Sequence, residues 1–146
     1  YEVVIEGTLD DPENPDARWR EYQFHGKPGE LDRRPPQVAP YHLRLDWLLW
    51  FVPLSPAYQG RWFRELLEQL LDGGEQIRRL VRVDPFGGEA PRAIRARRFR
   101  YRFTTRQERR GTGRWWYREL DGWFQHPITR RRVTAHRSGH SPVRSN

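Results

Sequence analysis

The chain has 146 residues, among them 7 Trp, 7 Phe and 6 Tyr, which is enough ring area for the core of one domain despite a mean hydropathy of −1.01. The absence of cysteine excludes a disulfide framework and a cysteine nucleophile, and no apolar run approaches the roughly 18 residues that cross a membrane. Five arginines and no acidic residue follow Asp121, so most of the net charge of +8 lies at the end of the chain.

The first predicted elements form a β-hairpin. Residues 1–8 alternate polar and apolar side chains, as in a half-buried strand with Val3 and Ile5 on one face. A turn rich in Pro, Asp and Asn follows, and three rings predict the returning strand: Trp19, Tyr22 and Phe24. Because the chain begins inside a strand and without Met, we expect a domain cut from a longer protein.

An irregular connection over residues 25–40, rich in Pro and Gly, leads to three predicted helices. The first, over 43–51, is apolar on all sides, so it would be buried or covered by a partner. The second, over 60–72, has a clean apolar stripe and ends at Gly73. A short third helix is predicted over 75–82.

Two late strands are predicted over residues 94–103 and 114–124, joined by one helical turn with a capping box between Thr105 and Glu108. The apolar side of the first strand changes phase, which predicts a bulge near Arg97 and Arg98. Its second half predicts rings packed on the helices (Phe99, Tyr101, Phe103) and arginines in solvent (Arg98, Arg100, Arg102).

Together these elements predict an α+β fold, with an antiparallel sheet made of the hairpin and the two late strands and with two or three inserted helices packed on it. The alternative is a small β-sandwich with a helical insertion. Residues 1–125 would form the domain, and residues 126–146 a basic, disordered tail.

Constellations of catalytic residues are scarce. The sequence holds no nucleophile elbow, P-loop or dinucleotide fingerprint. His136 and His140 have the spacing of two metal ligands on a helix but no third ligand nearby, so we expect neither a metal nor a cofactor.

The strand over 95–103 interleaves arginines with rings, which is the composition of an RNA-binding surface and makes a nucleic-acid-binding module the alternative function. A strand with rings on the core and arginines in water explains the same pattern and is favoured.

Two charges inside the apolar segment 43–51 predict structural anchors. Arg44 and Asp46 lie two residues apart, so each needs its own partner. An unpaired buried charge would cost several kcal/mol, so we expect Asp46 to bind Arg33, Arg34 or a backbone N–H of residues 33–40.

The same helix predicts a partner surface. Trp47 and Trp50 are three residues apart and share one face, which we expect to be the inner one. Leu48 and Phe51 share another face, and we expect them to bind a partner protein, because an exposed apolar patch marks such a site.

The order of several short segments resembles the C-terminal soluble domain of the lipase maturation factor family. They include Val4-Ile-Glu-Gly-Thr8, Trp19-Arg-Glu-Tyr-Gln-Phe24, Lys27-Pro-Gly29, Arg33-Arg-Pro-Pro36, Arg44-Leu-Asp-Trp47 and Thr112-Gly-Arg-Trp-Trp116. The resemblance covers residues 1–124.

The resemblance implies a non-catalytic domain of a multi-pass membrane protein that helps a secreted client, such as a lipase, to fold. Its implied partners are that client and the membrane-embedded part of its own chain. Animal members reside in the endoplasmic reticulum. Because the chain lacks cysteine and uses Arg for 26 of its 27 bases, we expect a bacterial member in a cell membrane.

Overall fold

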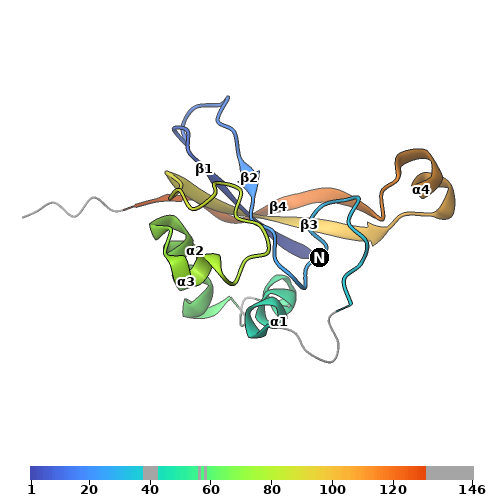
Figure 1. Cartoon of the computed structure of the whole chain (residues 1–146), viewed down its shortest axis with the longest axis horizontal. Helices are drawn as coiled ribbons and strands as arrows, with labels where there is room; N and C mark the ends of the chain where they lie inside the picture. Colours follow the sequence, from blue (N-terminus) through green and yellow to red (C-terminus); the bar gives the residue numbers. More distant parts are fainter. Residues whose placement is uncertain (38–42, 56, 58, 131–146) are drawn as a thin grey trace, which may run out of the picture.

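A computed structural model describes residues 1–37, 43–55, 57 and 59–130 of the chain (Figure 1). Its four described strands form one antiparallel sheet in the order β2-β1-β3-β4. The elements are β1 (Glu2–Thr8), β2 (Arg20–Glu21), α1 (Arg44–Phe51), the 3₁₀ turn η1 (Val52–Leu54), α2 (Gly60–Asp72), α3 (Glu75–Arg78), β3 (Ala93–Phe103), α4 (Arg106–Thr112) and β4 (Trp116–Thr129). The α+β prediction is confirmed, and the described strands do not divide into the two sheets of a sandwich.

Strand β1 is buried on both faces. Val3 and Ile5 belong to the core shared with the helices, as their alternation predicts. Val4 and Glu6 on the opposite face are also buried, so the half-buried strand expected from the sequence is wrong. The reason is that long side chains of β3 cover this face, since Arg95 and Arg97 lie opposite Glu6 and Val4 and pair with the Glu6 carboxylate.

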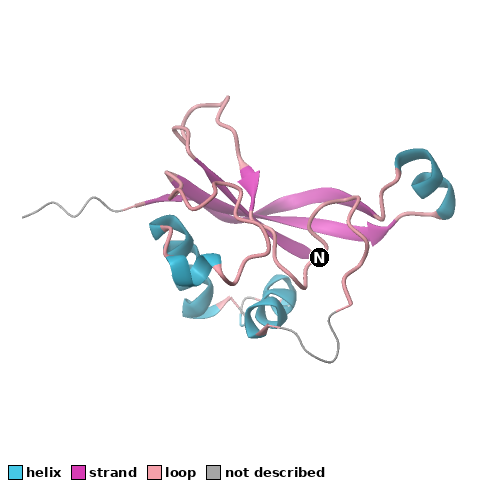
Figure 2. Cartoon of the chain, viewed as in Figure 1, coloured by secondary structure: helices cyan, strands magenta, loops and turns pink. Residues whose placement is uncertain are grey.

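Helices α1, α2 and α3 lie together on one side of the sheet (Figures 1 and 2). Helix α2 buries the stripe that its sequence predicts, with Phe63, Leu66, Leu67, Leu70 and Leu71 all in the core. It ends at Gly73, whose φ of 67° is left-handed and therefore suits glycine. Helix α3 is shorter than the predicted 75–82, although Ile77 and Val81 are both buried.

Strands β3 and β4 form a long hairpin with an irregular register. The 11 residues of β3 lie opposite 14 residues of β4, and the register shifts three times, including between Ala96 and Arg97 and between Arg98 and Phe99. A register irregularity therefore occurs near Arg97, but the bulge predicted within β3 itself is wrong, because β3 pairs with β1 without a shift. The extra residues lie in β4, so β3 itself keeps a regular alternation of side chains.

This alternation places the β3 rings on the face away from the helices. Arg98 pairs with Val3, which faces the helices, whereas Phe99 pairs with Glu2 on the other face. The prediction that Phe99, Tyr101 and Phe103 pack on the helices is therefore wrong. Phe99 is buried beneath the guanidinium groups of Arg97 and Arg118, and Phe103 is 61% exposed. Arg100 and Arg102 are exposed as predicted, and Arg98 is partly exposed.

Strand β4 continues past Phe124, where its sequence pattern predicts that it ends. Residues 126–129 remain part of the strand, and Ile128 pairs with Ile94 and packs against the core. Arg130 then donates hydrogen bonds to the carbonyls of Ala90 and Pro91. The rest of the predicted basic tail, including His136 and His140, lies outside the described residues.

Candidate functional site

The inner face of α1 is built around an acidic residue. Asp46 is 1% exposed, and its Oδ1 accepts a hydrogen bond of 2.9 Å from the backbone N–H of Gly26. A Cβ on residue 26 would lie 2.9 Å from the Cβ of Asp46, so only glycine allows this approach. Asp46 therefore anchors α1 to the turn over residues 24–27 (the 24–27 turn), not to residues 33–40 as expected.

Two further bonds join α1 to the 24–27 turn. Trp50 Nε1 donates to the Gly26 carbonyl at 3.0 Å, and Lys27 Nζ donates to the Leu49 carbonyl at 3.3 Å. Lys27 also forms an ion pair with the carboxylate of Glu2, the first residue of β1. The rotation of α1 and its position against the sheet are thus set by three hydrogen bonds to Gly26 and Lys27 and by the ion pair of Lys27 with β1.

Arg33 holds the same turn from its other side. Its guanidinium donates to the carbonyls of Phe24, His25 and Lys27 at 3.2, 2.8 and 2.7 Å. Its own carbonyl accepts a hydrogen bond from Trp116 Nε1 at 3.0 Å, which joins the turn to β4. Arg33 is thus an anchor, as expected, but its partners are backbone carbonyls, not Asp46.

Lys27 is the functional residue that the sequence reasoning missed. Its side chain is 6% exposed, and burial lowers its pKa to about 7, while the carboxylate of Asp46 opposes this shift. It is the only lysine among 27 basic residues. That exception was a usable signal, because a compact ammonium fits a buried position that a planar guanidinium does not.

Three other expected anchors do not anchor the helix. Arg44 is exposed at the start of α1, and Arg34 is exposed with its guanidinium over the ring of Trp115. Trp47, expected inside, is 45% exposed, whereas its expected companion Trp50 is partly buried. The bond from Asp46 to Gly26 turns Asp46, Leu49 and Trp50 inward, and Trp47 then faces outward.

The outward side of α1 forms an apolar groove. Trp47, Leu48, Phe51, Ala57 and Trp62 line a cavity of about 200 Å³ (the α1 groove). The rings of Trp47 and Phe51 contact each other at 4.5 Å between centroids. Leu43 and Leu54, at the two ends of the helix, are 40% and 64% exposed and extend the patch. Leu48 and Phe51, the predicted partner face, are both partly exposed in this groove.

The arginine-rich strand β3, which suggested nucleic-acid binding, carries arginines on both faces of the sheet. The buried carboxylate of Glu6 pairs with Arg95 at 2.7 Å and with Arg97 at 2.6 Å. Two further strand arginines pair with acids of the β3–β4 hairpin, Arg98 with Asp121 and Arg102 with Glu108. These four guanidinium groups are paired with three carboxylates of the chain, which disfavours them as phosphate contacts.

Within the described residues, no cluster of His, Asp and Glu could hold a metal ion. The described helices also include none with the length and apolar character needed to span a bilayer.

Comparison with known proteins agrees with the resemblance seen in the sequence. A family profile described as "Lipase maturation factor C-terminal domain" matches residues 1–126. The chain belongs to the lipase maturation factor family. It is 38% identical over 130 residues to lipase maturation factor 1 of Mus musculus, which covers 87% of this chain and 23% of that protein. It is 40% identical over 122 residues to lipase maturation factor 2 of Homo sapiens, which covers 81% of this chain and 16% of that protein.

The chain thus spans less than a quarter of the length of these lipase maturation factors. They are animal proteins, so the expectation of a bacterial member receives no support from them. No solved structure matches the chain.

Proposed function

We propose that this domain is a non-catalytic folding factor that binds an incompletely folded secreted protein, such as a lipase, through the α1 groove. The observation that carries the proposal is the distribution of side chains on α1, with the Asp46 anchor inside and with Trp47, Leu48 and Phe51 on the outward side. A helix that exposes Trp47 and partly exposes Leu48 and Phe51 is typical of a protein-binding surface.

The size and chemistry of the groove fit this role. A cavity of about 200 Å³ lined by three aromatic rings, a leucine and an alanine accepts one or two large apolar side chains of a client. Such side chains are exposed in a chain that has not finished folding and are buried once it has. The groove would therefore distinguish folding intermediates from the mature lipase.

The buried polar groups of the domain support a non-catalytic role. Asp46, Lys27 and Arg33 are the most buried charges around α1, and each of them bonds to the backbone of the 24–27 turn or of α1. Charges used in this way stabilise the domain and position the groove. The similarity to lipase maturation factors also supports a setting next to a membrane, and hydrophobic segments of about 20 residues elsewhere in the reading frame would test it.

A paired substitution in the full-length protein tests the groove. Leu48→Asp places a charge in it, and Leu120→Asp makes the same change at a residue 52% exposed on the open face of the sheet. Each variant is expressed with a secreted lipase in cells that lack their own lipase maturation factors. We expect Leu48→Asp to lower secreted lipase activity at least fivefold, as loss of an interface hot spot does, and Leu120→Asp to leave it unchanged. Equal effects of the two variants, or none from Leu48→Asp, would contradict the proposal.

A photo-crosslinking side chain at position 48 identifies the occupant of the groove. A crosslink to the lipase during its synthesis is expected. If the crosslink forms only within the full-length protein, the groove is covered by the membrane-embedded part of the same chain, and the client assignment is wrong.

A further inference from the structure

The end of the β3–β4 hairpin, residues 102–117 (the hairpin tip), forms a second surface on the molecule. Figure 1 shows α4 at the end of the hairpin, opposite α2 and α3 along the long axis of the domain. The tip is rigid for its size, because Thr105 and Glu108 form the predicted capping box and Arg102 donates two hydrogen bonds of 2.9 Å to Glu108. Its position is fixed by hydrogen bonds from the N–H groups of Trp115 and Trp116 to the Leu31 carbonyl.

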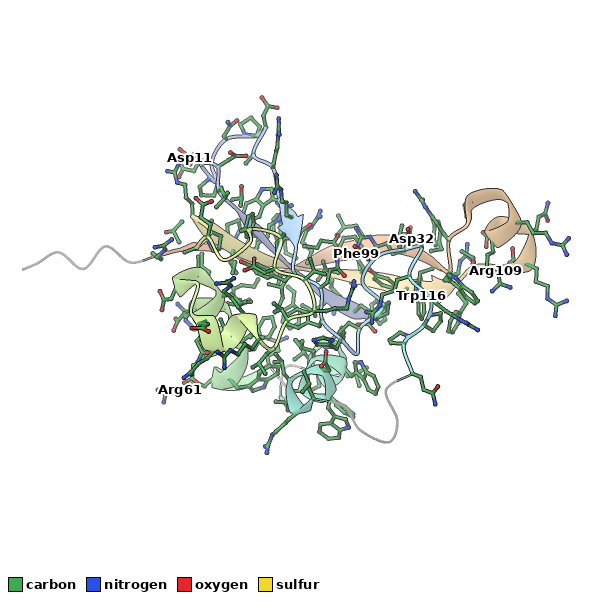
Figure 3. All side chains as sticks on the ribbon, in the orientation of Figure 1. Asp11, Asp32, Arg61, Phe99, Arg109 and Trp116 are labelled. Atoms are coloured by element: carbon green, nitrogen blue, oxygen red, sulfur yellow. The ribbon has the colours of Figure 1, made fainter. Side chains whose placement is uncertain are left out.

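The tip carries a concentrated positive charge. It contains five arginines and one acid, Glu108, which Arg102 neutralises. The four remaining arginines are Arg106, Arg109, Arg110 and Arg114, of which Arg109 is partly exposed and the others are exposed. Arg114 lines a pocket with three acids of the neighbouring segments, Glu21, Glu30 and Asp32, whereas Arg106, Arg109 and Arg110 do not line it (Asp32 and Arg109 are labelled in Figure 3). This contrasts with the rest of β3, where Glu6 and Asp121 pair with the arginines.

Large rings accompany this charge, and each of them has another ring or a guanidinium group over it. Phe103 stacks on Trp116 at 4.4 Å between centroids, Arg102 lies over Tyr117 at 4.3 Å, and both Arg34 and Arg109 lie over Trp115. Phe103 and Tyr117 are nevertheless 61% and 47% exposed, so much of their area meets water. The tip therefore presents partly covered rings surrounded by guanidinium groups.

We propose that the hairpin tip docks on the surface of a bilayer that contains anionic lipids. Four exposed or partly exposed arginines complement anionic headgroups, and rings with a polar surround are the residues that favour the interface between water and lipid. A single-stranded nucleic acid fits less well, because base stacking needs open ring faces and these rings have guanidinium groups or other rings on them. This inference does not rest on the α1 groove.

The test is a co-sedimentation assay of the 146-residue chain with lipid vesicles. One set of vesicles is pure phosphatidylcholine, and the other contains about 30% phosphatidylserine as the anionic lipid. Arg106→Gln/Arg110→Gln removes two charges from the tip. Arg61→Gln/Arg79→Gln removes two exposed charges from α2 and the residue after α3, and is the matched control. Both variants keep the basic residues after position 130, so the contribution of those residues to vesicle binding is the same in both.

The tip variant is expected to bind the anionic vesicles about 30-fold more weakly, at about fivefold for each arginine, and the control to bind like the parent chain. Binding should also weaken as salt is added. Thermal unfolding shows whether both variants keep the fold. Equal losses in both variants would mean that net charge alone acts, and no loss in the tip variant would mean that the tip does not touch lipid; either result overturns the proposal. Tight, tip-dependent binding to a single-stranded oligonucleotide without binding to the vesicles would overturn it in favour of a nucleic-acid surface.

Discussion

Helices α1 and α2 pack on the same face of the sheet, but different kinds of residue determine which side of each helix is buried. Helix α2 turns an apolar stripe of five core residues toward the sheet, and its charged residues face water. Helix α1 turns Asp46 and Leu49 inward and leaves Trp47 outside. One hydrogen bond to Gly26 thus outweighs the burial of a tryptophan ring, because leaving a buried carboxylate unpaired costs more than exposing part of a ring. A helix with an apolar surface on all sides is oriented by its polar residue.

The largest effect is expected in α2. Leu67 is fully buried, and Leu67→Ala should lower the free energy of unfolding by about 2–5 kcal/mol through lost burial and a residual cavity. Urea unfolding measures this value. A loss below about 1 kcal/mol would show that α2 contributes little to the core and would remove the contrast between the two helices.

The next effect concerns the buried amine beneath α1. Lys27 has a pKa of about 7 in the folded chain against 10.5 when exposed. Between these values the folded state binds fewer protons than the unfolded state, so stability rises with pH from about 7 upward, by at most about 1.4 kcal/mol per pH unit. The free energy of unfolding at pH 7–9 should therefore rise more steeply for the parent chain than for Lys27→Met.

This comparison is unusually clean because Lys27 is the only lysine in the chain. Burial raises the pKa values of Tyr22 and Tyr101. Their ionisation therefore affects stability only above this pH range, where it lowers the free energy of unfolding as the pH rises. Parallel curves for the two proteins would show that the amine keeps its ordinary pKa.

Removing the anchor of α1 is expected to cost less than removing a core leucine. Asp46→Ala leaves the Gly26 N–H buried without an acceptor and should lower the free energy of unfolding by about 1–3 kcal/mol. Hydrogen exchange should show the loss in α1 and in the 24–27 turn before the sheet. A variant that is as stable as the parent but no longer supports lipase secretion would make Asp46 a functional residue rather than an anchor.

The smallest effects separate the two tryptophans of α1. Trp50→Phe removes the bond to the Gly26 carbonyl and should cost about 1 kcal/mol. Trp47→Phe changes a residue that is 45% exposed and should stay within about 0.5 kcal/mol of the parent chain. The reverse order, measured by thermal unfolding, would mean that Trp47 is the inner residue of the helix.

The sequence allowed prediction of those elements whose local pattern agrees with their burial. Helix α2, its end at Gly73 and the capping box at Thr105 follow from spacing and residue type alone. The face on which the β3 rings lie could not be predicted in this way. The extra residues of the hairpin lie in the partner strand β4, and the sequence of β3 does not show where its neighbour has insertions. The sequence predicts that Asp46, a charge in an apolar helix, must have a hydrogen-bond partner. The partner itself, 20 residues earlier in the chain, depends on how the 24–27 turn folds.

The irregular register of β4 also affects how the domain meets an unfolded chain. Among the described strands β4 lies at the edge of the sheet, where its free backbone groups could pair with a strand from another molecule. Its longest stretch of unbroken pairing with β3 is Trp116–Leu120, and the bulges beyond it interrupt the ladder that an incoming strand would need. Under the proposed function, the bulges give an incompletely folded client a poor template for added strands, which would keep its contact with the domain reversible.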